Sequence, residues 1–245
     1  MPRTLFISDL HLSAERPAAL ARFEAFARDA ARGAAALYVL GDLFEAWTGD
    51  DELDAPDGDP VAKAVSGALS ALAAAGTTVR LMHGNRDFLM RAGFARACRG
   101  TLVPDPSVVP LEGDAALLLH GDTLCTDDVD YQAWRTVSRS EGWQQVFLAR
   151  PLAERREIMR RLRERSRESI REKPAEVMDV NAGAVEDAFR RHRVQRMIHG
   201  HTHRPTRHEL IVDGRACERW VLPDWYGENG GWLEASGGRF EMLRF

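Results

Sequence analysis

The stretch Thr4-Leu5-Phe6-Ile7-Ser8-Asp9-Leu10-His11 joins a short apolar run to an Asp-x-His cluster. The run contains β-branched and aromatic residues and has the length of a buried strand. In extended backbone, Asp9 and His11 point to one face while Leu10 points into the core. We therefore expect a strand whose end carries a carboxylate and an imidazole suited to one metal ion.

The same arrangement, an apolar run followed at once by a polar cluster, occurs four more times. The further runs are Ala36 to Leu40, Val79 to Met82, Ala115 to Leu119 and Val194 to Ile198. Their clusters are Gly41-Asp42, Gly84-Asn85-Arg86-Asp87, His120-Gly121-Asp122 and His199-Gly200-His201-Thr202-His203. Helical segments separate the first strands, which predicts parallel pairing with reactive groups at the carboxyl ends of the strands. We therefore expect an α/β fold in which the five clusters converge.

Turn residues and periodicity place the remaining elements. A helical pattern containing Leu20, Phe23 and Phe26 stops at Gly33, and the Ala-rich stretch 61–75 predicts a second helix. Between them, residues 47–60 are rich in Asp, Gly and Pro and predict a loop. The last segments predict an antiparallel meander and are His208 to Val212, Arg215 to Leu222, Trp232 to Ala235 and Arg239 to Phe245.

The composition sets broad limits. A chain of 245 residues can bury a sizeable core, and its net charge of −4 gives no global attraction to nucleic acid or to an anionic membrane. Cys98, Cys125 and Cys217 form no CxxC pair, so we expect no disulfide framework and a reducing cytosol. The sequence shows neither a secretion signal nor a spanning segment.

Residues 127–192 form a mostly helical segment between the fourth and fifth clusters. From Arg150 to Lys173 it holds ten basic and five acidic residues, which suits either a solvated helix face or a lid over the site. We expect one domain, residues 1–245, with this segment inserted as a helical lid. The neighbouring apolar residues are read either as the core of the lid or as a surface for anionic lipid: Trp143, Val146, Phe147, Leu148 and Leu152.

Seven residues of the clusters offer nitrogen or oxygen ligands and no sulfur: Asp9, His11, Asp42, Asn85, His120, His201 and His203. Such a set favours Mn²⁺ or Fe²⁺ and is compatible with Zn²⁺. Each residue taken alone has a structural alternative, such as a turn at Asn85 or a helix cap at Asp122. The recurrence of all five clusters at strand ends favours a two-metal site, in which a carboxylate such as Asp42 bridges the ions.

Longer strings around the clusters resemble the calcineurin-like metallophosphoesterase superfamily, and within it the diphosphatases that act on a UDP-linked diacylated glucosamine. The strings are Leu40 to Trp47, His83 to Leu89, His120 to Asp128 and His199 to Pro205. The resemblance implies a four-layer αββα sandwich, two Mn²⁺ ions, and hydrolysis to UMP and the acyl sugar 1-phosphate in lipid A synthesis. Because this substrate is acylated, we expect a monomer that binds peripherally to the cytoplasmic face of the bacterial inner membrane and binds no nucleic acid.

The resemblance also implies roles for individual residues. One ion would take Asp9, His11, Asp42 and His203, and the other Asp42, Asn85, His120 and His201. The implied reaction is in-line attack of a metal-bound hydroxide on the α-phosphorus, with Asp42, Asn85, Arg86 and His201 as catalytic residues. The implied substrate contacts are Asn85, Arg86, Asp128, Ser166, Ile170, Lys173 and His201.

Arg86 departs from the wider superfamily, in which many members have His after the Asn. Arginine stays charged and cannot protonate an alkoxide leaving group, but its planar fork binds phosphate oxygens. Cleavage of a pyrophosphate expels a phosphomonoester whose second pKa is about 6, so this group leaves without a proton. Arg86 therefore favours a diphosphate substrate.

Three alternatives remain at this stage. The chain could be another nucleotide pyrophosphatase or a cyclic-nucleotide phosphodiesterase, or a metal-binding scaffold without activity. A nuclease is disfavoured because the inserted segment lacks a long aromatic and basic surface for stacking bases.

Overall fold

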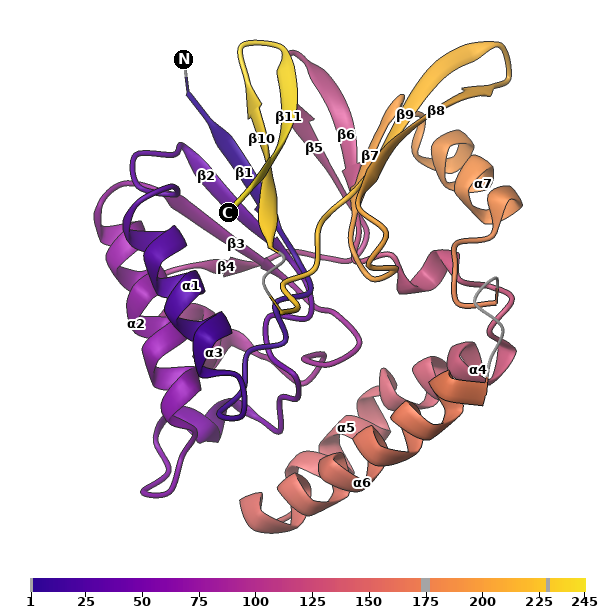
Figure 1. Cartoon of the computed structure of the whole chain (residues 1–245). Helices are drawn as coiled ribbons and strands as arrows, with labels where there is room; N and C mark the ends of the chain where they lie inside the picture. The colour runs from indigo at the N-terminus through magenta and orange to yellow at the C-terminus, as the bar shows by residue number, and fades with distance from the viewer. Residues whose placement is uncertain (1, 173–176, 228–229) are drawn as a thin grey trace.

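A computed structural model describes residues 2–172, 177–227 and 230–245, and it contains two β-sheets packed face to face (Figure 1). The first sheet has the strand order β11-β10-β1-β2-β3-β4. Its strands are β1 Thr4–Ile7, β2 Ala36–Leu40, β3 Thr78–Met82, β4 Thr101–Leu102, β10 Gly231–Ser236 and β11 Arg239–Arg244. The second sheet has the order β5-β6-β7-β9-β8, and its strands are β5 Ser107–Leu111, β6 Asp114–Leu118, β7 Arg196–His199, β8 Thr206–Val212 and β9 Arg215–Val221.

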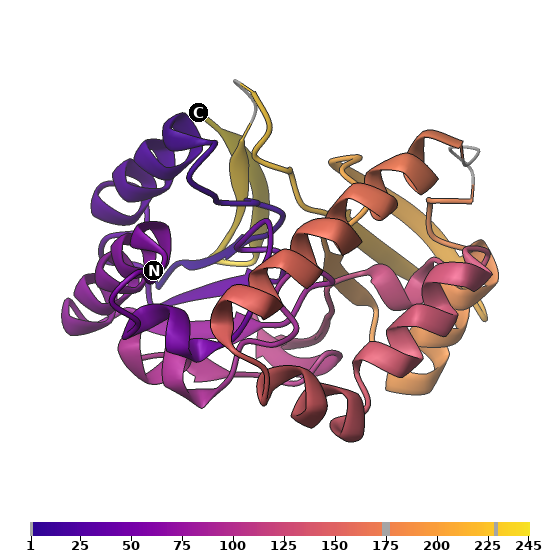
Figure 2. The ribbon, with the colours of Figure 1, turned by 90° about the horizontal axis from the view of Figure 1, so that it is seen from below.

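Helices cover the outer faces of both sheets, which gives the predicted four layers (Figure 1). On the first sheet lie α1 Pro17–Arg28, α2 Pro60–Ala74 and α3 Ala92–Ala97, and on the second lies α7 Ala182–His192. Three more helices, α4 Val129–Ser138, α5 Glu141–Leu148 and α6 Leu152–Glu172, lie below the sandwich, where α6 runs diagonally across its lower end (Figure 2). We call these three the insertion helices. No helix among the described residues is long and apolar enough to cross a membrane.

The alternation of side chains along each strand explains the layers. Leu5 and Ile7 of β1 join the core under α1 and α2, whereas Phe6 joins the core between the sheets. In β6, Leu118 faces the first sheet and Leu117 packs beneath α7 with Phe189. Strands covered on both faces read as continuous apolar runs, which is why the five runs identify the centre of the sandwich.

The sequence-based strand predictions agree with the structure for the five runs, whose observed bounds lie within two residues of the expected ones. The predicted terminal meander is wrong in its pairing. Strands β8 and β9 form a hairpin in the second sheet, where β9 runs parallel to β7, whereas β10 and β11 form a hairpin in the first sheet beside β1. The strands were recognisable locally, but the sheet that each hairpin joins depends on contacts distant in sequence. Strands β4 and β5 were not predicted, since β4 has two residues and β5 contains Pro110.

The segment predicted as an insertion, residues 127–192, includes α7. That helix buries Val185 and Phe189 against the second sheet, so it forms the outer layer there. The apolar residues next to the basic run belong largely to the core. Phe147 is buried, and Trp143 and Leu148 pack against the same cluster, whereas Val146 is exposed.

The acidic stretch after Gly49 attaches α6 to the first layer through the 3₁₀ helix η1 Asp50–Leu53. The buried guanidinium of Arg155 donates to Thr48 O at 2.5 Å and to Asp51 Oδ1 at 3.0 Å. Arg156 forms a bidentate pair with Glu52 at 2.6 and 3.0 Å. The N-terminal part of α6 is therefore docked on the core by two adjacent arginines.

Arg155→Ala should lower the free energy of unfolding by roughly 1 to 3 kcal/mol, because the buried carbonyl of Thr48 loses a charged donor. Arg160→Ala is the control, since Arg160 is exposed and pairs with Glu157 and Glu164 of its own helix; it should leave the stability nearly unchanged. Urea unfolding followed by circular dichroism measures both. Equal midpoints for the two variants would contradict this account of the docking.

Candidate metal centre

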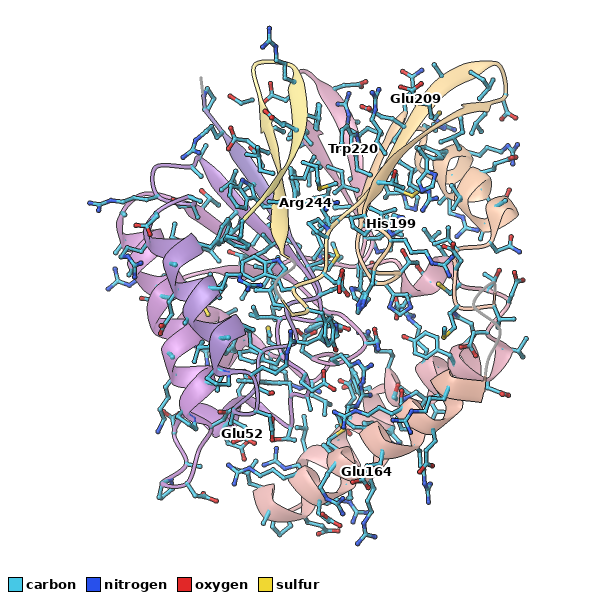
Figure 3. All side chains as sticks on the ribbon, viewed as in Figure 1. Glu52, Glu164, His199, Glu209, Trp220 and Arg244 are labelled. Atoms are coloured by element: carbon cyan, nitrogen blue, oxygen red, sulfur yellow. The ribbon has the colours of Figure 1, made fainter. Side chains whose placement is uncertain are left out.

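The five polar clusters meet at the carboxyl ends of β1, β2, β3, β6 and β7, where the two sheets approach the insertion helices. His199, at the end of β7, marks this edge of the second sheet in Figure 3. The predicted convergence is therefore present in the structure. It brings together all seven residues that were expected to be ligands.

The backbone of these loops differs from the extended form that was expected. Asp9, His11, Asp42, His201 and His203 have φ between 49° and 69°, in the left-handed region. This conformation costs about 1 to 2 kcal/mol for each such residue, and strain of this kind concentrates at functional sites. The extended backbone predicted for Asp9 and His11 was therefore wrong, although the two side chains still lie together.

Hydrogen bonds between neighbouring loops hold this conformation. Asp9 N donates to Gly41 O at 3.1 Å, and His11 N donates to Asp42 O at 3.0 Å. The loops after β1 and β2 thus continue alongside each other beyond the ends of their strands. This arrangement brings Asp9 and Asp42 to the same edge.

Asp9 is fully buried, and its two carboxylate oxygens differ in their surroundings. Oδ2 accepts hydrogen bonds from Ser8 Oγ at 2.6 Å and from His201 N at 2.8 Å. Oδ1 has no hydrogen-bond partner among the described residues and lies 3.4 Å from His203 Nε2 and 4.0 Å from His11 Nε2. One oxygen is used to orient the carboxylate, and the other faces the two imidazoles.

The imidazoles of His11 and His203 point toward each other, with 3.4 Å between their Nε2 atoms. Asp42 Oδ2 lies 3.8 Å from His11 Nε2. Asp9, His11 and His203 thus offer ligand atoms that lie within 4.8 Å of one another, and Asp42 adjoins this group at His11. A divalent cation would satisfy all four donors, including the unpaired oxygen of Asp9.

A second group forms around Asn85. His120 Nδ1 hydrogen-bonds with Leu40 O at 2.9 Å, so this nitrogen carries the proton and Nε2 is directed to Asn85 Oδ1 at 3.0 Å. His201 Nδ1 lies 3.1 Å from the same oxygen, and Asp42 Oδ1 lies 3.7 Å from His120 Nε2. Asp42 therefore turns one oxygen to each group, which is the arrangement that a bridging carboxylate requires.

The charges of the centre favour a cation. The nearby charges of Asp42, Asp9 and Asp122 raise the pKa of His120 to about 9, although burial opposes its protonation. The pKa of Asp9 lies well below its usual range, because contacts with His203 and the neighbouring imidazoles outweigh its burial. Burial and the charge of His120 lower the pKa of His201 to about 4, which keeps it neutral as a ligand must be.

Arg86 and Glu45 flank the centre. Arg86 Nε lies 3.8 Å from Asp42 Oδ2 and NH1 lies 4.0 Å from Glu45 Oε1, and within the part of the chain that the structure describes both nitrogens are buried without hydrogen-bond partners. Glu45 Oε2 lies 3.2 Å from His11 Nδ1. The pKa of Glu45 is lowered to about 2: its burial acts in the opposite direction, but His11 and the charge of Arg86 outweigh it. Glu45 thus orients His11 through Nδ1, the ring nitrogen that does not face His203. The sequence did not indicate this role.

A cavity of about 440 Å³ opens beside the centre and is closed on its other side by α4 and α6. Asp42, Asn85, Arg86 and His201 line it on the side of the centre. The opposite wall includes Tyr131, Trp134, Leu162, Arg163, Ser166 and Met178.

Five residues of this wall, all except Ser166, were not predicted from the sequence. Tyr131 and Trp134 are aromatic residues three apart on α4, a spacing that could have marked them. Arg163 has Nε and NH1 buried without hydrogen-bond partners among the described residues, but nothing in the sequence separates it from the arginines around it.

The predicted substrate contacts in the insertion have different outcomes. Asp128 lines the cavity and also caps α4 by accepting from Tyr131 N at 3.1 Å. Ser166 lines the cavity as expected. The side chain of Ile170 and all of Lys173 lie outside the described residues.

The family model of the calcineurin-like phosphoesterases matches residues 2–205. The chain therefore belongs to this family, and the resemblance seen in its motifs is confirmed. It is 50% identical over 224 residues to a protein of Aromatoleum aromaticum, covering 91% of this chain and 89% of that relative. It is 46% identical over 242 residues to a protein of Escherichia coli O7:K1, covering 99% and 98%. Both relatives are named UDP-2,3-diacylglucosamine hydrolase.

Gly84→Ala should disrupt the centre, because a Cβ at this position would lie 2.1 Å from Asp42 Oδ1. The exposed Gly67 in α2 is the matched control, since a Cβ there meets nothing within 4 Å. We expect Gly84→Ala to lose hydrolase activity and Gly67→Ala to gain about 0.5 to 1 kcal/mol of stability. Thermal melting and hydrolysis of UDP-2,3-diacylglucosamine test this, and full activity of Gly84→Ala would contradict it.

Proposed function

We propose that the chain hydrolyses the pyrophosphate bond of UDP-2,3-diacylglucosamine and releases UMP and 2,3-diacylglucosamine 1-phosphate for lipid A synthesis. The observation that carries this proposal is the pair of donor groups that share Asp42 beside the guanidinium of Arg86, whose Nε and NH1 have no hydrogen-bond partner among the described residues. The names of the two relatives support the substrate.

Asp9, His11, Asp42 and His203 would hold one divalent ion, and Asp42, Asn85, His120 and His201 the other. Two bound ions would supply an activated water near neutral pH and neutralise charge on the phosphate. We propose Mn²⁺ for both positions, with Fe²⁺ and Zn²⁺ compatible with the same oxygen and nitrogen donors.

Arg86 provides what a pyrophosphate requires. Its Nε lies 3.8 Å from Asp42 Oδ2 and its NH1 lies 4.0 Å from Glu45 Oε1, and neither forms a hydrogen bond within the described part of the chain, so both can donate to the oxygens of the α-phosphate. Asn85 and His201 adjoin the same part of the cavity and would orient that phosphate. The leaving sugar phosphate needs no proton, so the lack of an acid at position 86 does not hinder the reaction.

The wall formed by the insertion would bind the rest of the substrate. Arg163 would donate to a phosphate or a carbonyl oxygen, and Ser166 and Asp128 would contact the sugar. Trp134, Leu162 and Met178 provide apolar surface for acyl chains. We retain Ile170 and Lys173 as proposed contacts from the resemblance. Residues 1–245 would form one monomeric domain, in which the inserted segment 127–192 supplies the insertion helices as a lid and α7 as the outer layer of the second sheet.

Asp42→Ala and Arg86→Ala test the reaction most directly. Asp42→Ala removes a donor from both groups, and Arg86→Ala removes the guanidinium that would bind the α-phosphate. Each variant should therefore lower kcat on UDP-2,3-diacylglucosamine with Mn²⁺ by about 100-fold or more. Arg161→Ala is the control, because Arg161 is exposed and pairs with Glu157 of its own helix. Release of UMP measures turnover.

Undiminished activity of Asp42→Ala would falsify the two-metal reaction. Turnover of a cyclic nucleotide or a soluble nucleotide pyrophosphate, together with no turnover of the diacyl sugar, would favour the alternative enzymes. Binding of Mn²⁺ without any turnover would favour a scaffold.

We further propose that the enzyme binds peripherally to the cytoplasmic face of the inner membrane, because its substrate carries acyl chains. Val129, Ala133 and Val137 form an exposed apolar stripe on α4, and Val146 is exposed on α5. Exposed arginines of α6 include Arg160, Arg161 and Arg167. Apolar and basic side chains together suit an interface with anionic lipid.

Val129→Asp combined with Val137→Asp should reduce cosedimentation with phosphatidylglycerol vesicles, because two charges would enter the apolar stripe. Binding of the wild-type chain should weaken between about 20 mM and about 300 mM salt. Val108→Asp is the control, because Val108 lies on β5 and is about as exposed as Val137. Failure of the wild-type chain to bind these vesicles at low salt would refute peripheral binding.

A further inference from the structure

Helix α4 contacts the loops of the metal centre as well as the cavity. Its residues Tyr131, Gln132 and Arg135 and its C-cap residue Arg139 lie at helical spacing, and all four side chains donate hydrogen bonds to the loops of the centre. Tyr131 Oη donates to Asp122 Oδ2, and Gln132 Nε2 donates to Asp122 O at 2.8 Å. Asp122 is fully buried and lies two residues after His120.

Arg135 connects α4 to Asp122 and Asp105, two carboxylates close to His120. Its Nε donates to Asp122 Oδ2 at 2.8 Å, and its NH2 lies 3.6 Å from Asp105 Oδ2. The other oxygen of Asp105 accepts from the backbone N of His120 at 3.2 Å. The position of the His120 backbone is thus linked to α4 through two carboxylates.

Arg139, one turn further along α4, reaches the loop that carries Asn85. Its NH2 donates to Gly84 O at 2.8 Å, and its guanidinium lies 5.0 Å above the ring of Phe88. Gly84 is packed so closely that a Cβ would lie 2.1 Å from Asp42 Oδ1. A shift of the Gly84 carbonyl would therefore move Asn85 relative to Asp42 and His120.

We propose that α4 positions Asn85 and His120 for the second metal ion, with Arg139 and Arg135 as positioning residues. This inference rests on the two-metal site proposed above. The insertion then has two roles, since it walls the cavity and also holds one half of the metal centre. Contacts behind the ligands of a metal typically change its affinity by about 10 to 100-fold.

Arg139→Met tests this role, because Met keeps an apolar stem over Phe88 and removes the donor to Gly84 O. Calorimetric titration of the metal-free protein with MnCl₂ should show two ions bound to the wild-type chain. In Arg139→Met the affinity for one ion should fall by about 10-fold or more, while the other stays unchanged. Arg139→Lys retains a charged donor and should recover most of the loss.

Arg161→Ala, an arginine of α6 that pairs with Glu157, should bind both ions as the wild-type chain does. Wild-type affinity for both ions in Arg139→Met, or an equal loss in Arg139→Lys, would overturn the positioning role. Asn85→Ala separates the two proposals. If Asn85→Ala binds two ions like the wild type, the proposed metal site itself is wrong, whatever Arg139→Met does.

Discussion

The carboxylate of Asp42 is the contact on which the rest of the site depends. One oxygen faces His11 and the other faces His120, while Arg86 N donates to Oδ1 at 2.8 Å. Each group takes donors from the ends of strands in both sheets, so a carboxylate shared by the two groups would link the sheets at this edge. The packing between the sheets, with Phe6, Leu118 and Trp220 in one core, holds the sheets together from within.

The loops that carry the ligands adopt a strained backbone conformation, which brings the ligands together. Five of the seven proposed ligands lie in the left-handed region, and Gly41 and Gly84 approach so closely that a Cβ on Gly41 would lie 2.6 Å from the Gly84 backbone. The strain is distributed over loops that are hydrogen-bonded to one another and to α4. A rigid scaffold around strained loops is the usual way to hold several ligands at fixed distances without a large loss of stability.

The sequence predicted the five strands that carry the clusters, their order along the chain and the convergence of the seven clustered residues, because an apolar run that ends in Gly-Asp or Asp-x-His is a local signal. It did not predict the backbone of Asp9 and His11, since left-handed conformation there depends on the neighbouring loop. Nor did it predict the partners of Arg155 or Arg135. Arg155 and Asp51 are separated by 104 positions, and many arginines of the insertion look alike in sequence. The pairing predicted for the last four strands, β8, β9, β10 and β11, was wrong for the same reason, because contacts distant in sequence decide which sheet each hairpin joins.

The central claim is that two ions occupy the centre and share Asp42. Anomalous diffraction at the manganese edge, from crystals grown with MnCl₂, tests it without relying on activity. The account predicts two peaks, one among Asp9, His11, Asp42 and His203 and the other among Asp42, Asn85, His120 and His201. A single peak, or two peaks that share no ligand, would contradict it.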